Sequence, residues 1–201
     1  MLKRLFFLIG IILLTMGCTT KVPAITQYVL QPNILMQPMQ KPSTKYLLKV
    51  AKTFSNENLM GKKMWYIEDS LQSNIYHQSQ WVSSPNTMLT QLLVEKIRQA
   101  DIFSGVVSYR SHISPHYRLE SNLEEFVQYF DNAKKQSYVV IKLSLELLTT
   151  QHLRPLAMKS FTVRVGVKSL NAKGGVEALN SALEKLLQEV ISWLKGVSYD
   201  Q

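Results

Sequence analysis

Four histidines, His77, His112, His116 and His152, are the first candidates for metal chemistry in this sequence. His112 and His116 are four residues apart, which is the spacing of two zinc ligands on one face of a helix. Pro115 lies between them, so we expect a loop here, and no third ligand is close in the sequence. We therefore expect no metal site at this motif.

Adjacent carboxylates and a glycine pair are the other candidates for chemistry. Glu68-Asp69 and Glu124-Glu125 could serve acid–base catalysis, but neighbours on a strand point to opposite faces, so we expect solvated positions instead. Gly174-Gly175 could hold an anion at the start of a predicted helix, but no dinucleotide or Walker motif accompanies it. No serine lies in a nucleophile elbow. The sequence predicts no catalytic residue and no cofactor.

The only cysteine of the chain, Cys18, has the clearest chemistry. Lys3 and Arg4 are followed by an uncharged apolar run over residues 5–16. This run is shorter than the roughly 20 residues of a membrane span, and it matches the apolar stretch of an export signal. It ends in Leu-Thr-Met-Gly-Cys, which resembles a bacterial lipobox, in which the cysteine is acylated and the chain is cut before it. We predict a lipoprotein signal peptide over residues 1–17 and a lipidated Cys18; a plain signal peptide with a chance cysteine is the alternative.

The charge of the exported chain is positive. Lys3 and Arg4 account for two of the 23 basic residues, so the mature chain keeps 21 against 14 acidic residues, a net charge of about +7. These residues are scattered and form no stripe with aromatics, so we expect no nucleic acid as a partner. Anionic phospholipid headgroups or an acidic partner suit this charge better.

Residues 18–44 are predicted to be a lipid-anchored flexible tether. It is punctuated by the prolines Pro23, Pro32, Pro38 and Pro42. Proline cannot continue a helix and favours extended conformations, and at ~3.1 Å per residue such a tether could reach several tens of Å. The sheet-prone Tyr28-Val29-Leu30 is the exception, because it could pack on the domain as an extra strand or bind a partner.

Residues 45–196 are predicted to form one α+β domain, in which two amphipathic helices pack on one face of a mixed or mostly antiparallel sheet. Period-two alternation predicts strands over 46–54, 64–68, 75–81, 117–127, 139–147 and 161–167, the last three in an antiparallel meander. Residues 102–103 and 106–107 are expected to lead into the next strand, with Gly105 as a bend. In the first strand of the meander, Val127 is assigned to the same face as Tyr117 and Leu119. One helix is predicted from Ser84-Pro85 to about residue 100, and another from Gly174-Gly175 to Gly196.

The three tryptophans are expected in the core, since large aromatics dominate core burial. They are Trp65, Trp81 and Trp193. Trp193 lies beside the apolar stripe of its helix and is the strongest of the three as a partner contact.

Several residues follow an order that is typical of one protein family. These are Tyr28 and Leu30, Trp81 before a proline-started helix, Tyr117-Arg118-Leu119-Glu120 followed by Leu123 and Phe126, Leu179-Asn180-x-Ala182-Leu183, and Trp193-Leu194. In this order the chain resembles the ABC-type transport auxiliary lipoproteins, the group that includes the paraquat-inducible protein C lipoprotein. The likeness covers about residues 28–194.

The resemblance implies a non-catalytic outer-membrane lipoprotein, facing the periplasm, that serves an intermembrane lipid transport system. Its partners would be an MCE-domain periplasmic protein, the inner-membrane permease and ATPase of that system, and the phospholipid membrane that holds its anchor; it could also form a homo-oligomer. Thr19, in place of Asp after the anchor, looks like the sorting pattern for outer-membrane delivery. The competing interpretation is a free-standing periplasm-facing lipoprotein with hydrolase or metal-dependent activity.

Replacing Cys18 by Ala is expected to leave the precursor uncut and to abolish incorporation of labelled palmitate, because the thiol is the acyl acceptor. Gel mobility and label in membrane fractions measure this, with Thr19→Ala as the control that keeps the cysteine. Normal processing and unchanged membrane fractionation of Cys18→Ala would contradict the predicted anchor.

Overall fold

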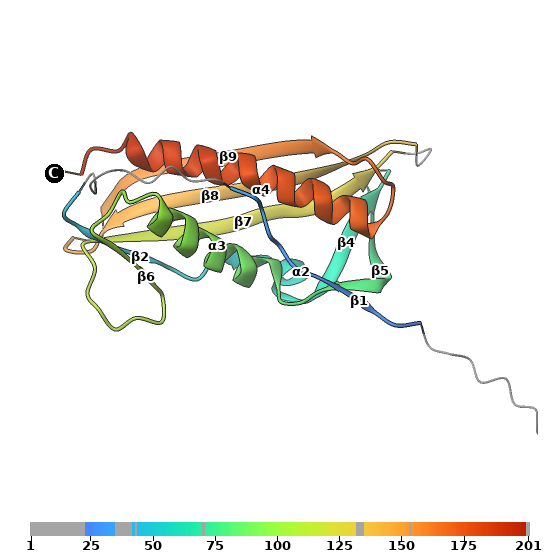
Figure 1. The fold of residues 1–201 in the computed structure, drawn as a ribbon, viewed down its shortest axis with the longest axis horizontal. Helices are drawn as coiled ribbons and strands as arrows, with labels where there is room; N and C mark the ends of the chain where they lie inside the picture. The colour runs from blue at the N-terminus through green and yellow to red at the C-terminus, as the bar shows by residue number, and fades with distance from the viewer. Residues whose placement is uncertain are drawn as a thin grey trace, which may run out of the picture.

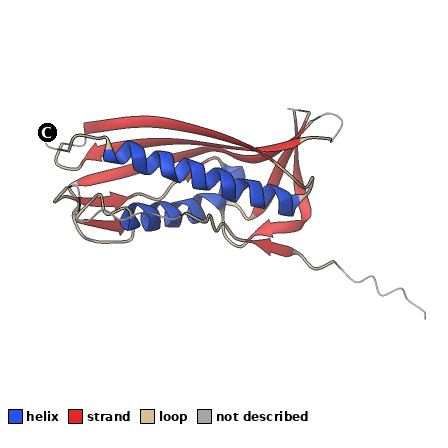
Figure 2. Ribbon diagram, turned by 45° about the horizontal axis from the view of Figure 1, so that its top comes forward, coloured by secondary structure: helices blue, strands red, loops and turns tan. Residues whose placement is uncertain are grey.

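The computed structural model describes residues 23–34, 42, 44–69, 71–131, 135–152 and 154–199. These form one nine-stranded mixed sheet, and two long helices cover one of its faces (Figures 1 and 2). The strands are β1 (Thr26–Tyr28), β2 (Leu47–Val50), β3 (Phe54–Ser55), β4 (Lys63–Glu68), β5 (Gln72–Trp81), β6 (Gly105–Ser108), β7 (Tyr117–Phe130), β8 (Ser137–Thr149) and β9 (Arg154–Gly166). The helices are the short α2 (Glu57–Met60) and the long α3 (Pro85–Gln99) and α4 (Ala172–Lys195). The predicted α+β class is confirmed.

Strand β7 is the centre of the sheet. On one side it pairs antiparallel with β8 over nearly its whole length, and β8 pairs antiparallel with β9, so the predicted meander is confirmed. On the other side it pairs in parallel with β2, β3 and β4 in succession. β6 extends the sheet beyond β2, while β5 and then β1 extend it beyond β4.

The strand predicted over residues 46–54 is divided into β2 and β3. The backbone N–H of Ala51 still donates to Leu119 on β7, but the N–H of Thr53 donates to the Thr90 hydroxyl of α3 at 3.0 Å. Thr53 is therefore tied to a helix rather than to the ladder. The strand is interrupted because its backbone finds a side-chain partner.

A β-bulge at Glu124 reverses the facing of side chains along β7. Leu123 pairs with Leu143 and Glu125 with the preceding residue of β8, so Glu124 is the additional residue of the bulge. Core-facing residues have odd numbers before the bulge and even numbers after it, from Phe126 to Phe130. The assignment of Val127 to the face of Tyr117 was wrong, because one extra residue moves all later side chains to the other face.

Both long helices turn an apolar stripe to the sheet. α3 begins at Pro85 after Ser84, as predicted, and α4 begins at Ala172, two residues before the predicted start. Fully buried core residues include Leu89, Leu93 and Ile97 of α3 and Leu183, Leu186, Leu187 and Val190 of α4. α4 packs mainly on β8 and β9, and α3 packs on β2 and β6, so that together they cover the core.

Gly174 and Gly175 allow α4 to begin close against its surroundings. A Cβ at Gly174 would collide with the backbone carbonyl of Ser169, and one at Gly175 would collide with the Gln128 side chain of β7. Asn171 caps the helix by accepting the N–H of Gly174 at 2.9 Å. Close packing, not an anion site, therefore accounts for this glycine pair.

Residues 26–34, here termed the strap, pack on the domain. β1 pairs in parallel with β5, and the strap then crosses α4 (Figure 1). Leu30 and Ile34 are only 5% and 7% exposed. The N–H groups of Gln31 and Asn33 donate to Asn180 and Glu184 of α4 at 2.8 and 2.7 Å.

The strap corrects the predicted tether over residues 18–44, because its backbone and apolar side chains are engaged by the domain. Residues 18–22, 35–41 and 43, and the signal peptide predicted over residues 1–17, lie outside the described residues. The predicted domain end at residue 196 is also too early. Tyr199 is buried, its carbonyl accepts the Tyr117 hydroxyl, and its own hydroxyl donates to the Leu194 carbonyl at 2.7 Å.

Shortening Leu30 to Ala is expected to lower the free energy of unfolding by about 2–3 kcal/mol, because a buried leucine side chain is lost from the core. Chemical unfolding curves measure this. The neighbouring Val29 is 46% exposed, and Val29→Ala should change stability by less than about 0.5 kcal/mol. If Leu30→Ala unfolded like the parent protein, the strap would be a mere spacer.

Candidate functional site

The face of the sheet opposite α3 and α4, here termed the open face, carries no other described element over β7, β8 and β9 (Figures 1 and 2). Its side chains are those that alternate with the buried residues of β8, such as Val139 and Ile141. The open face has an aromatic part near β4 and a charged part toward the beginning of β7.

The aromatic part is a patch of half-buried side chains drawn from four neighbouring strands. This aromatic patch consists of Trp65, Ile67, Ile75, Tyr129, Tyr138 and Val140. Ile67 pairs with Tyr129, which pairs with Tyr138, and the two tyrosine rings stack with centroids 5.1 Å apart. The guanidinium of Arg164 on β9 lies 3.4 Å from the centre of the Tyr138 ring. Pre-ordered tyrosines with a stacked arginine are the residue types that dominate protein interfaces.

Tyr129 also has a fixed hydrogen bond. Its hydroxyl donates to Glu125 at 2.7 Å. Burial, reinforced by the Glu125 carboxylate, raises the pKa of Tyr129 well above its usual range. The phenol therefore stays neutral and serves as a donor at physiological pH.

The charged part of the open face is paired within itself. Arg118 lies 3.0 Å from Glu120, and Lys142 lies 2.7 Å from Glu124. Ser144 also donates to Glu124. The hydrogen bond from Lys142, followed by that from Ser144, lowers the pKa of Glu124.

The bulge corrects the prediction that Glu124 and Glu125 point to opposite faces. Glu125 pairs with Lys142 across the ladder, and Glu124 forms its ion pair with the same lysine, so both carboxylates lie on the open face. Their hydrogen-bond partners differ, since Glu124 accepts from Lys142 and Ser144 and Glu125 from Tyr129. Each carboxylate is thus engaged structurally.

The histidines are not members of the aromatic patch, although His77 lies on β5 two residues after Ile75. All four are exposed, and His112 and His116 lie in a loop, as predicted. The Nδ1 of His116 accepts the N–H of Leu47 at 3.0 Å, and its ring lies against Tyr46. Within the described residues, no three histidine, cysteine or acidic side chains are placed to share a metal ion.

The tryptophans have three different environments. Trp81 is buried against Phe126, and Trp193 is half-buried with its ring edge-on to Phe161. Trp65 lies on the open face, so the prediction of a core position for this residue was wrong. Met64 is buried on one side of β4 while Trp65 and Ile67 are half-buried on the other. Apolar residues on both faces of a short strand were the signal for an apolar surface.

None of the helices in the described part of the chain is long and apolar enough to cross a membrane. Cys18, the one predicted attachment to a membrane, lies outside the described residues. Its lipidation therefore remains a prediction.

Two solved structures share this α+β fold. One is a protein of family DUF330 from Xanthomonas campestris, with a TM-score of 0.75, 20% identity, and coverage of 84% of this chain and 94% of that one. The other is an uncharacterized protein with a TM-score of 0.64, 16% identity, and coverage of 85% and 99%. No curated protein matches the chain. These likenesses establish the fold.

The chain belongs to the family of ABC-type transport auxiliary lipoprotein components, whose model matches residues 28–191. This confirms the resemblance seen in the sequence. The protein is thus a member of a bacterial envelope lipoprotein family associated with transport. The match begins inside the strap, in agreement with its place in the fold.

Acid stability tests the ion pair of the open face. The pKa of Glu124 is lowered by folding, so the pair contributes stability above the ordinary glutamate pKa of about 4.3, and this is lost as pH falls through the lowered pKa. Glu124→Gln should therefore be less stable at neutral pH and lose less on acidification. The effect should be small, because both side chains are partly exposed.

Unfolding curves between roughly pH 7 and pH 3 measure this. Glu146→Gln removes a carboxylate of β8 on the same face of the sheet and is the control. If the free energy of unfolding depended on pH in the same way for Glu124→Gln and the parent protein, the stabilising role of the Glu124–Lys142 ion pair would be refuted.

Proposed function

We propose that this protein is the outer-membrane docking component of an MCE/ABC-type intermembrane lipid transport system and that it has no catalytic role. The observation that carries the proposal is the family match over residues 28–191, because the family is that of ABC-type transport auxiliary lipoproteins. Lipidated Cys18 holds the domain on the periplasmic side of the outer membrane. The direct partner is the MCE-domain periplasmic protein, which connects to the permease and ATPase of the inner membrane.

The aromatic patch is the contact that we assign to the MCE-domain protein. It joins side chains of β5, β4, β7 and β8 into one surface, whereas isolated exposed apolar residues are common on any protein. The Tyr129–Tyr138 stack and Arg164 are ordered before binding, which reduces the entropy lost on docking. The charged part of the open face supplies a polar rim with both signs of charge.

Removing the apolar side chains of this patch tests the contact. Ile67→Gln combined with Ile75→Gln is expected to lower recovery of the MCE-domain protein several-fold in cross-linked pull-downs from membranes. Met158→Gln combined with Leu170→Gln, at exposed apolar positions outside the patch, is the matched control and should retain recovery. Melting curves of both double variants verify folding.

Equal recovery with both double variants would remove the patch as the docking surface. If the patch variant lost only self-association, measured by light scattering, the occupant would be a second copy of the chain and the assignment would be wrong. Turnover of an ester, peptide or glycan substrate by the purified protein would contradict the non-catalytic role.

A further inference from the structure

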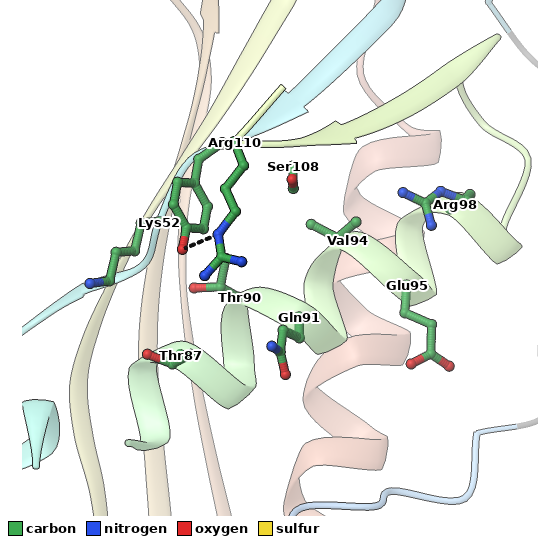
Figure 3. A pocket seen from close by; sticks show the side chains of 10 residues that line it. Lys52, Thr87, Thr90, Gln91, Val94, Glu95, Arg98, Ser108 and Arg110 are labelled. Atoms are coloured by element: carbon green, nitrogen blue, oxygen red, sulfur yellow. Dashed lines mark hydrogen bonds between the residues drawn. The ribbon is translucent and has the colours of Figure 1, made fainter. Parts of the chain in front are cut away.

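A pocket on the helix side of the sheet lies between α3 and the chain that follows β2 and β6 (Figure 3). Its volume is about 230 Å³. Its lining residues are Lys52, Thr87, Thr90, Gln91, Val94, Glu95, Arg98, Ser108, Tyr109 and Arg110. Three of them are cationic, and they come from three separate segments of the chain.

The positive charge of this pocket is not neutralised by the protein. Within the described part of the chain, no carboxylate forms an ion pair with Lys52, Arg98 or Arg110. The one acidic residue of the lining, Glu95, lies 3.0 Å from Lys96, and Figure 3 shows its side chain directed away from Arg98 and Arg110. The pocket therefore attracts anions.

The two arginines are positioned before any ligand arrives. The Nε and Nη2 of Arg98 both donate to the Val106 carbonyl, at 3.3 and 3.0 Å. The Nε of Arg110 donates to the Tyr109 hydroxyl at 3.2 Å, and its guanidinium reaches toward Thr90 on α3 (Figure 3). Guanidinium groups held in this way lose little conformational entropy when they bind an oxyanion. Two of their remaining N–H groups can donate side by side to two oxygen atoms of the anion.

The wall beside Lys52 is rigid as well. The Thr90 hydroxyl accepts the N–H of Thr53 and donates to the Asn86 carbonyl, while Ser121 of β7 donates to the Thr53 hydroxyl at 2.9 Å. This buried network fixes the segment after β2 to both α3 and β7. The distance across the pocket is thus set by the fold.

We propose that this pocket binds a phosphate-bearing anion, namely a phosphomonoester or phosphodiester with a small organic group. Arg110 supplies the charge beside Thr90, while Lys52 and Arg98 lie toward the two ends of the pocket and add to its positive potential (Figure 3). The Ser108 hydroxyl and Gln91 add donors, and Val94 and the Tyr109 ring contact the organic group. The pocket is smaller than the roughly 300 Å³ at which pockets for drug-sized ligands begin, so it holds a group the size of glycerol phosphate and no acyl chain.

A free organophosphate and a phospholipid headgroup share this chemistry, and titration calorimetry separates them. Full-length protein in uncharged detergent is titrated with inorganic phosphate, glycerol 3-phosphate and dihexanoyl-phosphatidylglycerol. A lipid headgroup source predicts that the short-chain lipid binds at least tenfold more tightly than glycerol 3-phosphate. Similar affinities for the two indicate a free organophosphate.

Lys52→Gln combined with Arg110→Gln is expected to weaken binding of the preferred probe at least tenfold. Arg98 is left intact, because it also donates to Val106. Lys62→Gln combined with Lys168→Gln removes the same charge at exposed positions elsewhere and should change affinity less than twofold. Arg110→Lys keeps the charge without the planar fork and should fall in between.

Two results would overturn the site. One is no measurable heat for any of the three probes at millimolar concentration; the other is equal weakening in the two double variants, which shows only general attraction to a basic protein. Melting curves of both double variants confirm that they fold. The site is independent of the docking proposal, because recovery of the MCE-domain protein is measured separately and depends on other residues.

Discussion

The structure depends on the backbone hydrogen bonds of one long strand, β7, which must be formed along both of its edges. β8 pairs with one side of β7 along its whole length except at the bulge of Glu124, whereas the other side is shared by β2, β3 and β4 in succession. Because buried backbone groups must be paired, a strand as long as β7 requires several short partners on this side. The helices then cover the one face that the alternating apolar residues define.

Long periodic segments were predictable, and tertiary partnerships were not. The stripe of α4 and the alternation of β8 each extend over many residues, so local pattern was sufficient. The strap shows no long periodic pattern, and it is ordered by distant partners, namely β5 and the side chains of Asn180 and Glu184 on α4. The bulge at Glu124 leaves no local mark, yet it determines the facing of Val127 and of both carboxylates.

The candidate sites differ in how far they could be predicted from the sequence. The lipobox is contiguous, so Cys18 was accessible to motif reasoning. The aromatic patch is made by register between β4, β7 and β8, and the cationic pocket by three segments that meet only in the fold. These two surfaces lie on opposite faces of the sheet. The proposed protein contact and the proposed anion site therefore do not overlap.

Because the strap is packed on the domain, it limits the orientation of the domain relative to a membrane. If Cys18 is the anchor, only seven residues separate it from Thr26, and a fully extended chain gives at most about 28 Å between them. α4 alone, with 24 residues, is about 36 Å long. The connecting segment is thus shorter than the domain, so an anchor at Cys18 would place the end of the molecule that carries β1 and β5 toward the membrane and the opposite end away from it.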